Sequence, residues 1–506
     1  MTITASGADS APGRVRSFLR THPESIVAVV VFFVLVATSS QYGWHRDELY
    51  FVVAGDHPAW GYPDQPLLTP LLSAALNALG HGSLVVVRLA SAAASAATAL
   101  LTGIMAGQLG ASTGARLLAA TVWAVGAISL VTGHFVDTTT FDILATVAVC
   151  SCLLRAIAAE SGRWMVAAGA VLGFGLLNKL TVGFVIAVVC ACFLAVGPRR
   201  MLLSRWALIG AALAVLGAAP YLIWQSANGW PQLAVAHSIS GGGAEGGRVG
   251  VIPFQLLLVS PLLAPVWIAG MVRLLRNPRA RQARAFAIAY LVVLVAIILA
   301  GGKAYYAAGL LPVLVASGAI AADEWVRRRR SGPRRGLVAA ALLLAFVVDA
   351  ALGLALVPVR LLTATGVEAI NPDAGEQVGW QRFTASVATA FDEIPDGKRS
   401  TAVIFTGNYG EAGAVDKYGG AWGLPQAFSG HNGFALWGPP TTNGPVVLVG
   451  LPGGAALARY FSGCRVVTHV DDGVDLVNDE QGDAVRLCSG PAEPWSRLWP
   501  ELVHDD

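Results

Sequence analysis

Apolar runs long enough to cross a lipid bilayer recur along the first 357 residues of this chain. Of its 506 residues, 55% are apolar and 13% are charged, and about 20 consecutive apolar residues suffice to span a bilayer. We therefore predict a polytopic α-helical membrane protein with about eleven spans. The spans are expected near residues 25–40, 84–108, 114–133, 138–158, 164–178, 181–197, 204–224, 251–273, 284–300, 304–321 and 336–357.

Arginines mark one side of the predicted bundle. They cluster at the N-terminus and in the connections after alternate spans, within 14–20, at 116, and within 155–163, 199–205, 273–284 and 327–335. The positive-inside rule then predicts a cytoplasmic tail over residues 1–24 and a first outer loop over 41–83 in the plasma membrane. A signal peptide is the alternative for the N-terminal run, and the two short spans around Asn178 and Lys179 could instead form one broken segment.

The composition changes after Val357, which predicts a membrane domain over residues 25–357 and a soluble extracytoplasmic α/β domain over 358–506. Short apolar runs at 401–405, 445–451 and 464–470 read as strands, and helical patterns lie around 376–391 and 454–461. Cys464 and Cys488 would lie in an oxidising compartment, where they form either a disulfide or two buried thiols.

Ionisable side chains gather at the outer ends of the predicted spans. The set comprises Asp47, Glu48, Arg88, His134, Asp137, Asp142, Lys179 and Lys303. A charge near the bilayer centre costs roughly 2.5 to 3.5 kcal/mol, so such residues usually face a polar cavity. Any one of them could be a charge that snorkels to the interface, but groups of both signs on one side of the membrane favour a shared site. No basic and aromatic stripe of the kind that binds nucleic acid is present.

Acids and cations together at the outer surface suit the transfer of a sugar from a lipid-linked phosphate. A carboxylate, Asp47 or Glu48, could take the proton of an acceptor hydroxyl. Arg88, Lys179 and Lys303 could neutralise the departing phosphate, with Tyr305 and Tyr306 beside the donor. Phosphate is a good leaving group, so no general acid is required.

Five segments carry a resemblance to a known family: HRDELYFVVAGDHPAWGYPDQPLLTPLL, NKLTVGF, GKAYYAAGLLPVLVASGA, GNYGEAGAVDKYGG and SGHNGFALWGPP. Together they resemble bacterial membrane glycosyltransferases of family 39, which are related to protein mannosyltransferases and to the aminoarabinose transferase of lipid A. The resemblance implies a GT-C fold, interfacial helices in the first outer loop, a polyprenyl-phosphate sugar donor and, as we expect, inverting transfer.

By position, the resemblance matches Asp47 to the catalytic aspartate of the family and Glu48 to its neighbour. A second acidic site would be Asp137 or Asp142, with His134 nearby. The additional domains of protein mannosyltransferases have no counterpart here, which argues against assuming a protein acceptor. We expect an envelope lipid, a cell-wall glycan or another acceptor. No cofactor is clearly implied, and a divalent metal is left open because several acids could bind one.

The first outer loop and the external domain contain further candidates. Prolines and aromatics after Asp56 should bend the loop along the interface, and residues 67–79 should form an interfacial helix. Asp56 reads as a solvated or capping residue, whereas Asp64 is less settled because it lies close to the expected cavity. Five polar or aromatic residues in glycine-rich turns could bind the acceptor, although turn chemistry alone explains most of them: Asn408, Tyr409, His431, Asn432 and Trp437.

Three other classes of protein fit parts of the pattern. A transporter or flippase would place its charged residues near mid-bilayer, whereas here they lie at the outer ends of spans. A polysaccharide polymerase of the envelope also has many spans, but does not particularly predict paired acids directly after the first one. A non-catalytic scaffold leaves Lys179 and Lys303 unexplained.

Overall fold

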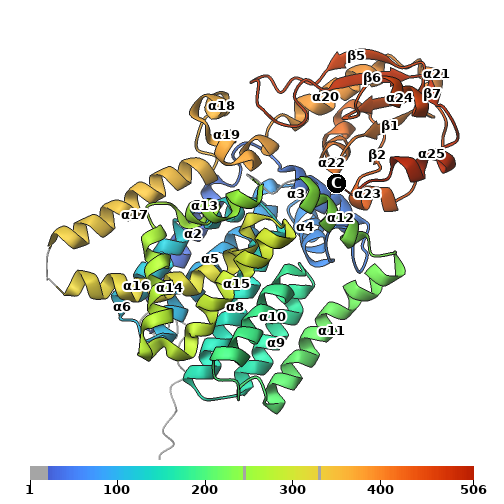
Figure 1. The fold of residues 1–506 in the computed structure, drawn as a ribbon. Coiled ribbons are helices and arrows are strands. Elements are labelled where there is room, and N and C mark those ends of the chain that lie inside the picture. Colours follow the sequence, from blue (N-terminus) through green and yellow to red (C-terminus); the bar gives the residue numbers. More distant parts are fainter. Residues whose placement is uncertain (1–20, 243–246, 329–331, 506) are drawn as a thin grey trace, which may run out of the picture.

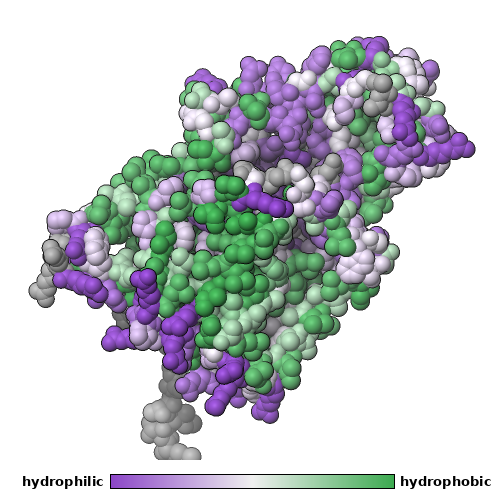
Figure 2. All heavy atoms as spheres, viewed as in Figure 1, coloured by the Kyte–Doolittle hydropathy of each residue, from purple (hydrophilic) through white to green (hydrophobic). Residues whose placement is uncertain are grey.

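A bundle of apolar helices and a smaller C-terminal α/β region make up this protein (Figure 1). The structure is a computed structural model that describes residues 21–242, 247–328 and 332–505. On the face shown in Figure 2 the bundle has an apolar band, with hydrophilic residues gathered at the end away from the C-terminal region. Such a band between two hydrophilic surfaces is the surface of a membrane-spanning bundle.

Helices form throughout the predicted apolar segments. Within the described ranges, six are long and apolar enough to cross a membrane, two of them when the 3-10 turns that precede them are included. They are α5 (Leu84–Gln108), α8 (Thr138–Ala158), α11 (Arg205–Ala227), α15 (Arg284–Ala300) after η1 (Pro278–Ala283), α16 (Leu311–Arg327) after η2 (Ala304–Leu310), and α17 (Gly332–Gly353).

The predicted number of eleven spans is not confirmed. Counting each bent pair as one span brings the described total to eight at most: α6 (Thr113–Ala124) with α7 (Ala127–His134), and α13 (Gly247–Val259) with α14 (Ala264–Arg276). The remaining apolar helices are shorter: α2 (Ser25–Thr38), α4 (Leu68–Leu79), α9 (Arg163–Leu176) and α10 (Thr181–Val196). A helix of 14 residues is about 21 Å long, less than the hydrocarbon core of about 30 Å.

The segment predicted as one span over 251–273 is broken into two helices. Helices α13 and α14 meet at 106°, and Ser260 lies between them with φ at +108°. Pro261 follows directly, and a residue before proline is forced out of the helical region of φ and ψ. The break at Lys179 was anticipated and lies between the end of α9 and the start of α10.

The C-terminal region is built on a five-stranded sheet in the order β2-β1-β3-β6-β5. Strand β1 pairs in parallel with β2 and β3, and β6 pairs antiparallel with β3 and β5. The strands are β1 (Val403–Thr406), β2 (Ala427–Ser429), β3 (Val446–Val449), β5 (Arg465–His469) and β6 (Ala484–Cys488), with β4 (Phe461–Ser462) and β7 (Gly490–Pro491) as a separate pair. The predicted strands match β1, β3 and β5, whereas β2 and β6 were not predicted.

Helices cover both faces of this sheet. The helices are α20 (Trp380–Asp392), α22 (Tyr409–Tyr418), α24 (Ala455–Tyr460) and α25 (Trp495–Leu502). Side chains alternate between the faces: Ile404 joins the core beneath α20 and α22, while Phe405 joins the core beneath α25. The first core also contains Leu49 and Tyr50 of α3 (Arg46–Asp56). The first outer loop and the C-terminal region therefore share one hydrophobic core, which fixes α3 in place.

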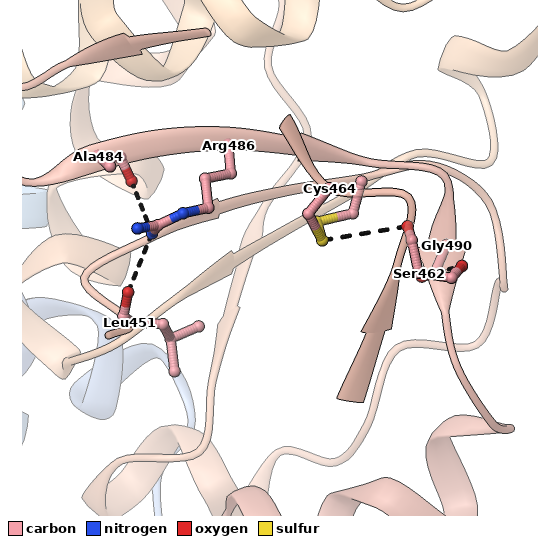
Figure 3. The surroundings of a disulfide bond; sticks show 7 residues. Leu451, Ser462, Cys464, Ala484, Arg486 and Gly490 are labelled. Carbon is pink, nitrogen blue, oxygen red and sulfur yellow. Dashed lines mark hydrogen bonds between the residues drawn. A yellow bond between two sulfur atoms is a disulfide. The ribbon is translucent and has the colours of Figure 1, made fainter. Parts of the chain in front are cut away.

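Cys464 and Cys488 form a disulfide in this region (Figure 3). The bond joins the residue before β5 to the last residue of β6, across a sequence separation of 24. Beside it, the Arg486 guanidinium donates hydrogen bonds to the carbonyl oxygens of Leu451 and Ala484 at 3.0 and 3.3 Å. The disulfide and this side chain tie together the edge of the sheet.

Candidate active site

The first turn of α3 separates the two adjacent acids. His45 caps the helix, because its Nδ1 accepts a hydrogen bond from the Asp47 amide at 3.1 Å. Glu48 completes a capping box by accepting from the His45 amide at 2.9 Å. Neighbouring residues on a helix point about 100° apart. Asp47 therefore faces a cavity while Glu48 faces the interior.

Glu48 forms a buried two-point ion pair with Arg88 of α5. The Arg88 Nε and Nη2 atoms donate to the two carboxylate oxygens at 2.9 and 2.8 Å, and both side chains are completely buried. The Val136 amide also donates to Glu48, at 2.9 Å. Such a fork-to-carboxylate geometry is strong and directional, and it joins α3 to α5.

The remaining N–H groups of Arg88 are also occupied. They reach four acceptors: Ser39 O at 2.9 Å, Gly43 O at 2.6 Å, Gln377 Oε1 at 3.1 Å and His134 Nε2 at 3.3 Å. No N–H is left for a donor phosphate, so the placement of Arg88 contradicts the role predicted for it. Glu48 and His134 belong to the same buried cluster, and neither lines a cavity that Asp47 faces.

Asp47 is only partly buried, with 28% of its side chain exposed. Its Oδ1 accepts a hydrogen bond from the Tyr409 hydroxyl at 2.8 Å, and its Oδ2 lies 4.0 Å from His45 Nδ1. Burial, followed by the charge of Asp47, raises the pKa of Tyr409 well above its ordinary value, so the phenol remains a donor. The C-terminal region thus orients one oxygen of Asp47 and leaves the other accessible.

Acidic side chains surround His45 behind Asp47. Burial opposes its protonation, but attraction to Asp373, Asp47 and Glu376 outweighs burial and raises its pKa to about 9. Its Nε2 lies 3.7 Å from Asp373 Oδ1. Nδ1 accepts from the Asp47 amide only in the neutral ring, so protonation of His45 removes this contact of the cap.

Asp47 opens onto a cavity of about 640 Å³, here called the first cavity. Two lysines reach it from different helices. Lys179 Nζ donates to the Thr138 and Thr139 hydroxyls at 3.1 and 3.3 Å, and it lies over the rings of Tyr305 and Tyr306 at 5.7 and 5.5 Å.

Lys303 Nζ lies 5.8 Å from the centre of the Tyr305 ring, and within the described ranges no hydrogen bond or ion pair engages it. Since Lys179 already donates to two hydroxyls, Lys303 is the ammonium of this cavity with all its N–H groups available for an anion.

A second cavity of about 410 Å³ adjoins the first at Asp47. Four residues line both cavities: Asp47, Asp137, Lys303 and Tyr305. The sequence left the choice between Asp137 and Asp142 open. Asp137 lies in this common wall just before α8, whereas Asp142 is buried within α8 and lines neither cavity.

Asp64 is a further acid of the first cavity. It accepts a hydrogen bond from the Tyr50 hydroxyl at 2.9 Å, and Tyr50 in turn accepts from the Gly433 amide at 3.2 Å. Burial raises the pKa of Asp64 to about 7, although the hydrogen bond from Tyr50 partly offsets it. Asp64 is therefore poised to change its protonation state near neutral pH.

The external candidates have different placements. Asn408 caps α22 by accepting from the Glu411 amide at 3.0 Å, which is a structural role. Tyr409 and Asn432 line the first cavity. The His431 ring lies 4.7 Å from the Tyr409 ring at a tilt of 41° and does not line this cavity, and Trp437 stacks on His57 at 4.3 Å, away from both cavities.

Several site residues were not singled out from the sequence. Tyr50 and Gln377 gave no signal, because their contacts join segments far apart in the chain. Asp349 did give one, as a lone acid in the apolar run LLLAFVVDAALG. Among the described residues, no group of three or more His, Cys, Asp or Glu side chains is placed to hold a metal ion.

Comparisons with known proteins give a family match over part of the chain and a fold for nearly all of it. Residues 64–224 match the protein family described as dolichyl-phosphate-mannose-protein mannosyltransferase. No curated protein sequence matches the chain. The structure of ArnT from Cupriavidus metallidurans bound to undecaprenyl phosphate is similar, with a TM-score of 0.54 and 18% identity over 95% of this chain and 98% of that one.

The apo structure of the same ArnT gives a TM-score of 0.56 and 16% identity with the same coverage. An apo oligosaccharyltransferase from Archaeoglobus fulgidus gives 0.47 and 15%, over 81% of this chain and 65% of that one. The ArnT similarity spans nearly the whole of both chains, so this integral membrane protein has the GT-C fold. The predicted resemblance to GT-C membrane glycosyltransferases is confirmed.

Proposed function

We propose that this protein is an inverting glycosyltransferase that moves a sugar from a polyprenyl-phosphate donor to a hydroxyl group of an envelope lipid or glycan. The reaction would take place at the outer face of the plasma membrane, with the C-terminal region also outside. One observation carries the proposal: the Asp47 carboxylate and the Lys303 ammonium lie in the wall common to two cavities. A base and a phosphate partner therefore meet where two substrates can meet.

The first cavity suits the donor. Its polar end holds Lys179 and Lys303, and apolar side chains of α10, α12 (Pro231–Gly242) and α15 line the rest: Leu180, Phe184, Val235, Ile239 and Ile297. Ammonium groups neutralise a phosphate, and the apolar wall fits the adjoining part of a prenyl chain. ArnT, which shares the fold, was crystallised with undecaprenyl phosphate. That supports a donor of the same class here.

The chemical step uses Asp47 as the general base. The acceptor hydroxyl transfers its proton to Asp47 Oδ2, and its oxygen forms a bond to the anomeric carbon of the sugar. The bond from that carbon to the phosphate oxygen breaks, and its electron pair leaves with the phosphate. Lys179 and Lys303 balance the added negative charge. Tyr409 keeps the carboxylate oriented by donating to Oδ1.

The test is transfer of radiolabelled sugar from a polyprenyl phosphate by the purified Asp47→Asn variant. Because general-base catalysis contributes on the order of 10² to 10⁴ in rate, turnover should fall by that factor. Donor binding and thermal stability should stay unchanged. Asp56→Asn, at the far end of the same helix and outside both cavities, is the matched control. Wild-type turnover by a folded Asp47→Asn protein would place the base elsewhere, with Asp137 next in line.

A further inference from the structure

We propose that the second cavity is the acceptor site and that it takes a neutral amphiphile, with a hydroxyl-bearing headgroup beside Asp349 and an apolar chain that enters from the bilayer between α13 and α17. The inference rests on the proposed function, because it assumes transfer at Asp47. It adds the class of acceptor and a residue that recognises it.

Part of the wall of the second cavity is apolar and continues to the lipid-facing surface. Val131 of α7, Leu257 of α13 and Val348 of α17 all line it. Leu257 and Val348 are 41% and 43% exposed. A side chain that both lines the cavity and faces the surrounding lipid marks an opening, so a lipid chain can enter sideways without crossing polar groups.

Asp349 lies deeper in the same cavity with an unused hydrogen-bonding atom. The residue is 1% exposed, and its Oδ2 has no hydrogen-bond partner among the described residues, although the Ser260 side chain is close by. An unpaired buried polar atom is costly, and an acid in an apolar span is costly as well. A ligand hydroxyl that donates to this carboxyl group would remove the cost.

The charges of the second cavity favour a neutral headgroup over a phosphate. Four acids line it, at positions 47, 137, 349 and 373, against Lys303 and His45. The first cavity is lined by as many acids, at positions 47, 64, 137 and 505, but by two lysines, Lys179 and Lys303. An anionic lipid would therefore bind the first cavity, with its second ammonium group, more favourably, whereas carboxyl groups accept hydrogen bonds from sugar or alcohol hydroxyls.

The common wall brings the two substrates together. An acceptor in the second cavity reaches Asp47 at the wall that adjoins the first cavity, since Asp47 and Lys303 line both. Inverting transfer then requires its oxygen to attack the anomeric carbon from the face opposite to the departing phosphate. Asp349 then acts as a positioning residue for the headgroup and takes no part in bond making.

The probe is decyl β-D-glucoside carrying a diazirine at the end of its chain, applied to the full-length protein in phosphatidylcholine nanodiscs. Photolabelling should saturate and map by mass spectrometry to α13 and α17. Val348→Trp, which fills the opening, should lower labelling at least tenfold. Leu344→Trp is the matched control, because Leu344 lies one turn away on the lipid-facing surface of α17 and does not line the cavity.

Two Asp349 variants separate recognition from folding. Asp349→Leu should lose labelling at least tenfold while thermal stability is kept or raised, because it removes an unpaired polar atom. Asp349→Asn should retain most labelling, since its amide still offers an acceptor oxygen. Equal labelling of Val348→Trp and Leu344→Trp, or displacement of the probe by decyl phosphate as readily as by decyl glucoside, would overturn the inference.

Polyprenyl phosphate binding to the same variants distinguishes the inference from the proposed function. It should be unchanged in Val348→Trp and in both Asp349 variants, because none of these positions lines the first cavity. A wild-type protein that binds no polyprenyl phosphate would overturn the proposed donor. Loss of donor binding in Val348→Trp would overturn the division between the two cavities.

Discussion

Asp47 and Glu48 are adjacent in the chain and lie in two opposite environments. Glu48 is fully buried, and its two oxygens are engaged by Arg88, the Val136 amide and the cap of α3. Asp47 is partly exposed and has one oxygen held by Tyr409 and the other open to the cavities. One acid is bound on all sides by the protein, whereas its neighbour is left available to a substrate.

The two adjacent acids have different roles, one structural and one open to a substrate. The Glu48 and Arg88 pair fixes the first turn of α3 against α5, and the direction of Asp47 depends on that turn. A carboxylate used as a base must be held in place without all its lone pairs being filled. The fully hydrogen-bonded Glu48 and the partly open Asp47 are therefore neighbours for a physical reason.

The largest expected effect is a loss of folding stability when the buried Glu48 is removed. Glu48→Ala leaves the Arg88 guanidinium buried without its counter-ion, and breaking such a pair typically costs about 3 to 5 kcal/mol. Asp47→Ala should cost about 1 kcal/mol, the value of one hydrogen bond. Thermal unfolding of the purified variants compares the two.

A double variant sharpens this first prediction. Glu48→Leu combined with Arg88→Met removes both charges, so it should recover part of the stability that Glu48→Ala loses. If Glu48→Ala unfolds no more easily than Asp47→Ala, the pair does not anchor α3 and the contrast between the two acids disappears.

The next effect is on donor affinity and concerns Lys303, which lines both cavities. Lys303→Ala removes the ammonium that has no protein hydrogen-bond partner in the described ranges, and binding of polyprenyl phosphate should weaken by about tenfold, or about 1.4 kcal/mol. Lys303→Arg keeps the charge and should weaken binding less. Lys398→Ala, on the exposed surface of the C-terminal region, is the matched control. Unchanged affinity in Lys303→Ala would make Lys303 a residue that merely reaches the interface.

Sequence reasoning predicted the apolar helices, the acid-rich outer loop, three of the five sheet strands and the two lysines that reach the cavity. These features depend on local composition, which determines burial and secondary structure before tertiary contacts form. The helix lengths and the 106° break between α13 and α14 were harder to predict from the sequence. Both depend on how each helix packs on its neighbours.

The roles of individual charged residues were the least predictable part. Arg88 and Lys303 look alike in the sequence, since each is a cation near an outer span end. The N–H groups of Arg88 are all used in hydrogen bonds because Ser39, Gly43 and Gln377 accept from them, and these contacts form only after folding. Resemblance to a family made Asp47 the candidate base, but it could not show that the Tyr409 hydroxyl would contact it from more than 360 residues away.

A smaller effect should appear in the pH dependence of stability. The pKa of Asp64 is about 7 in the folded protein and about 3.9 in an unfolded chain. The folded state therefore binds more protons between these values, and the contribution of Asp64 to stability is lost as the pH rises from about 4 through about 7. Asp64→Asn stays neutral and still accepts from Tyr50.

At pH 8 Asp64→Asn should be more stable than wild type by about 1 kcal/mol or more, and the difference should shrink toward pH 5. Thermal unfolding at both pH values measures it, with Asp56→Asn as a control at the exposed end of α3. A stability difference that does not change between pH 5 and pH 8 would show that Asp64 does not titrate in this range.

The smallest expected effect concerns the hydroxyl that links the two regions. Tyr409→Phe removes the 2.8 Å hydrogen bond to Asp47 Oδ1 but keeps the ring contacts with Tyr50 and His431 at 4.8 and 4.7 Å. Asp47 can then rotate, and one hydrogen bond of about 1 kcal/mol corresponds to a roughly fivefold change in rate. The kcat for sugar transfer should fall by about threefold to tenfold while donor affinity is unchanged. Tyr418→Phe, at the other end of α22, removes a hydroxyl that lines neither cavity and should leave kcat unaltered. If both variants match wild type, the position of Asp47 is set by His45 and the turn of α3 alone, and the C-terminal region only covers the site.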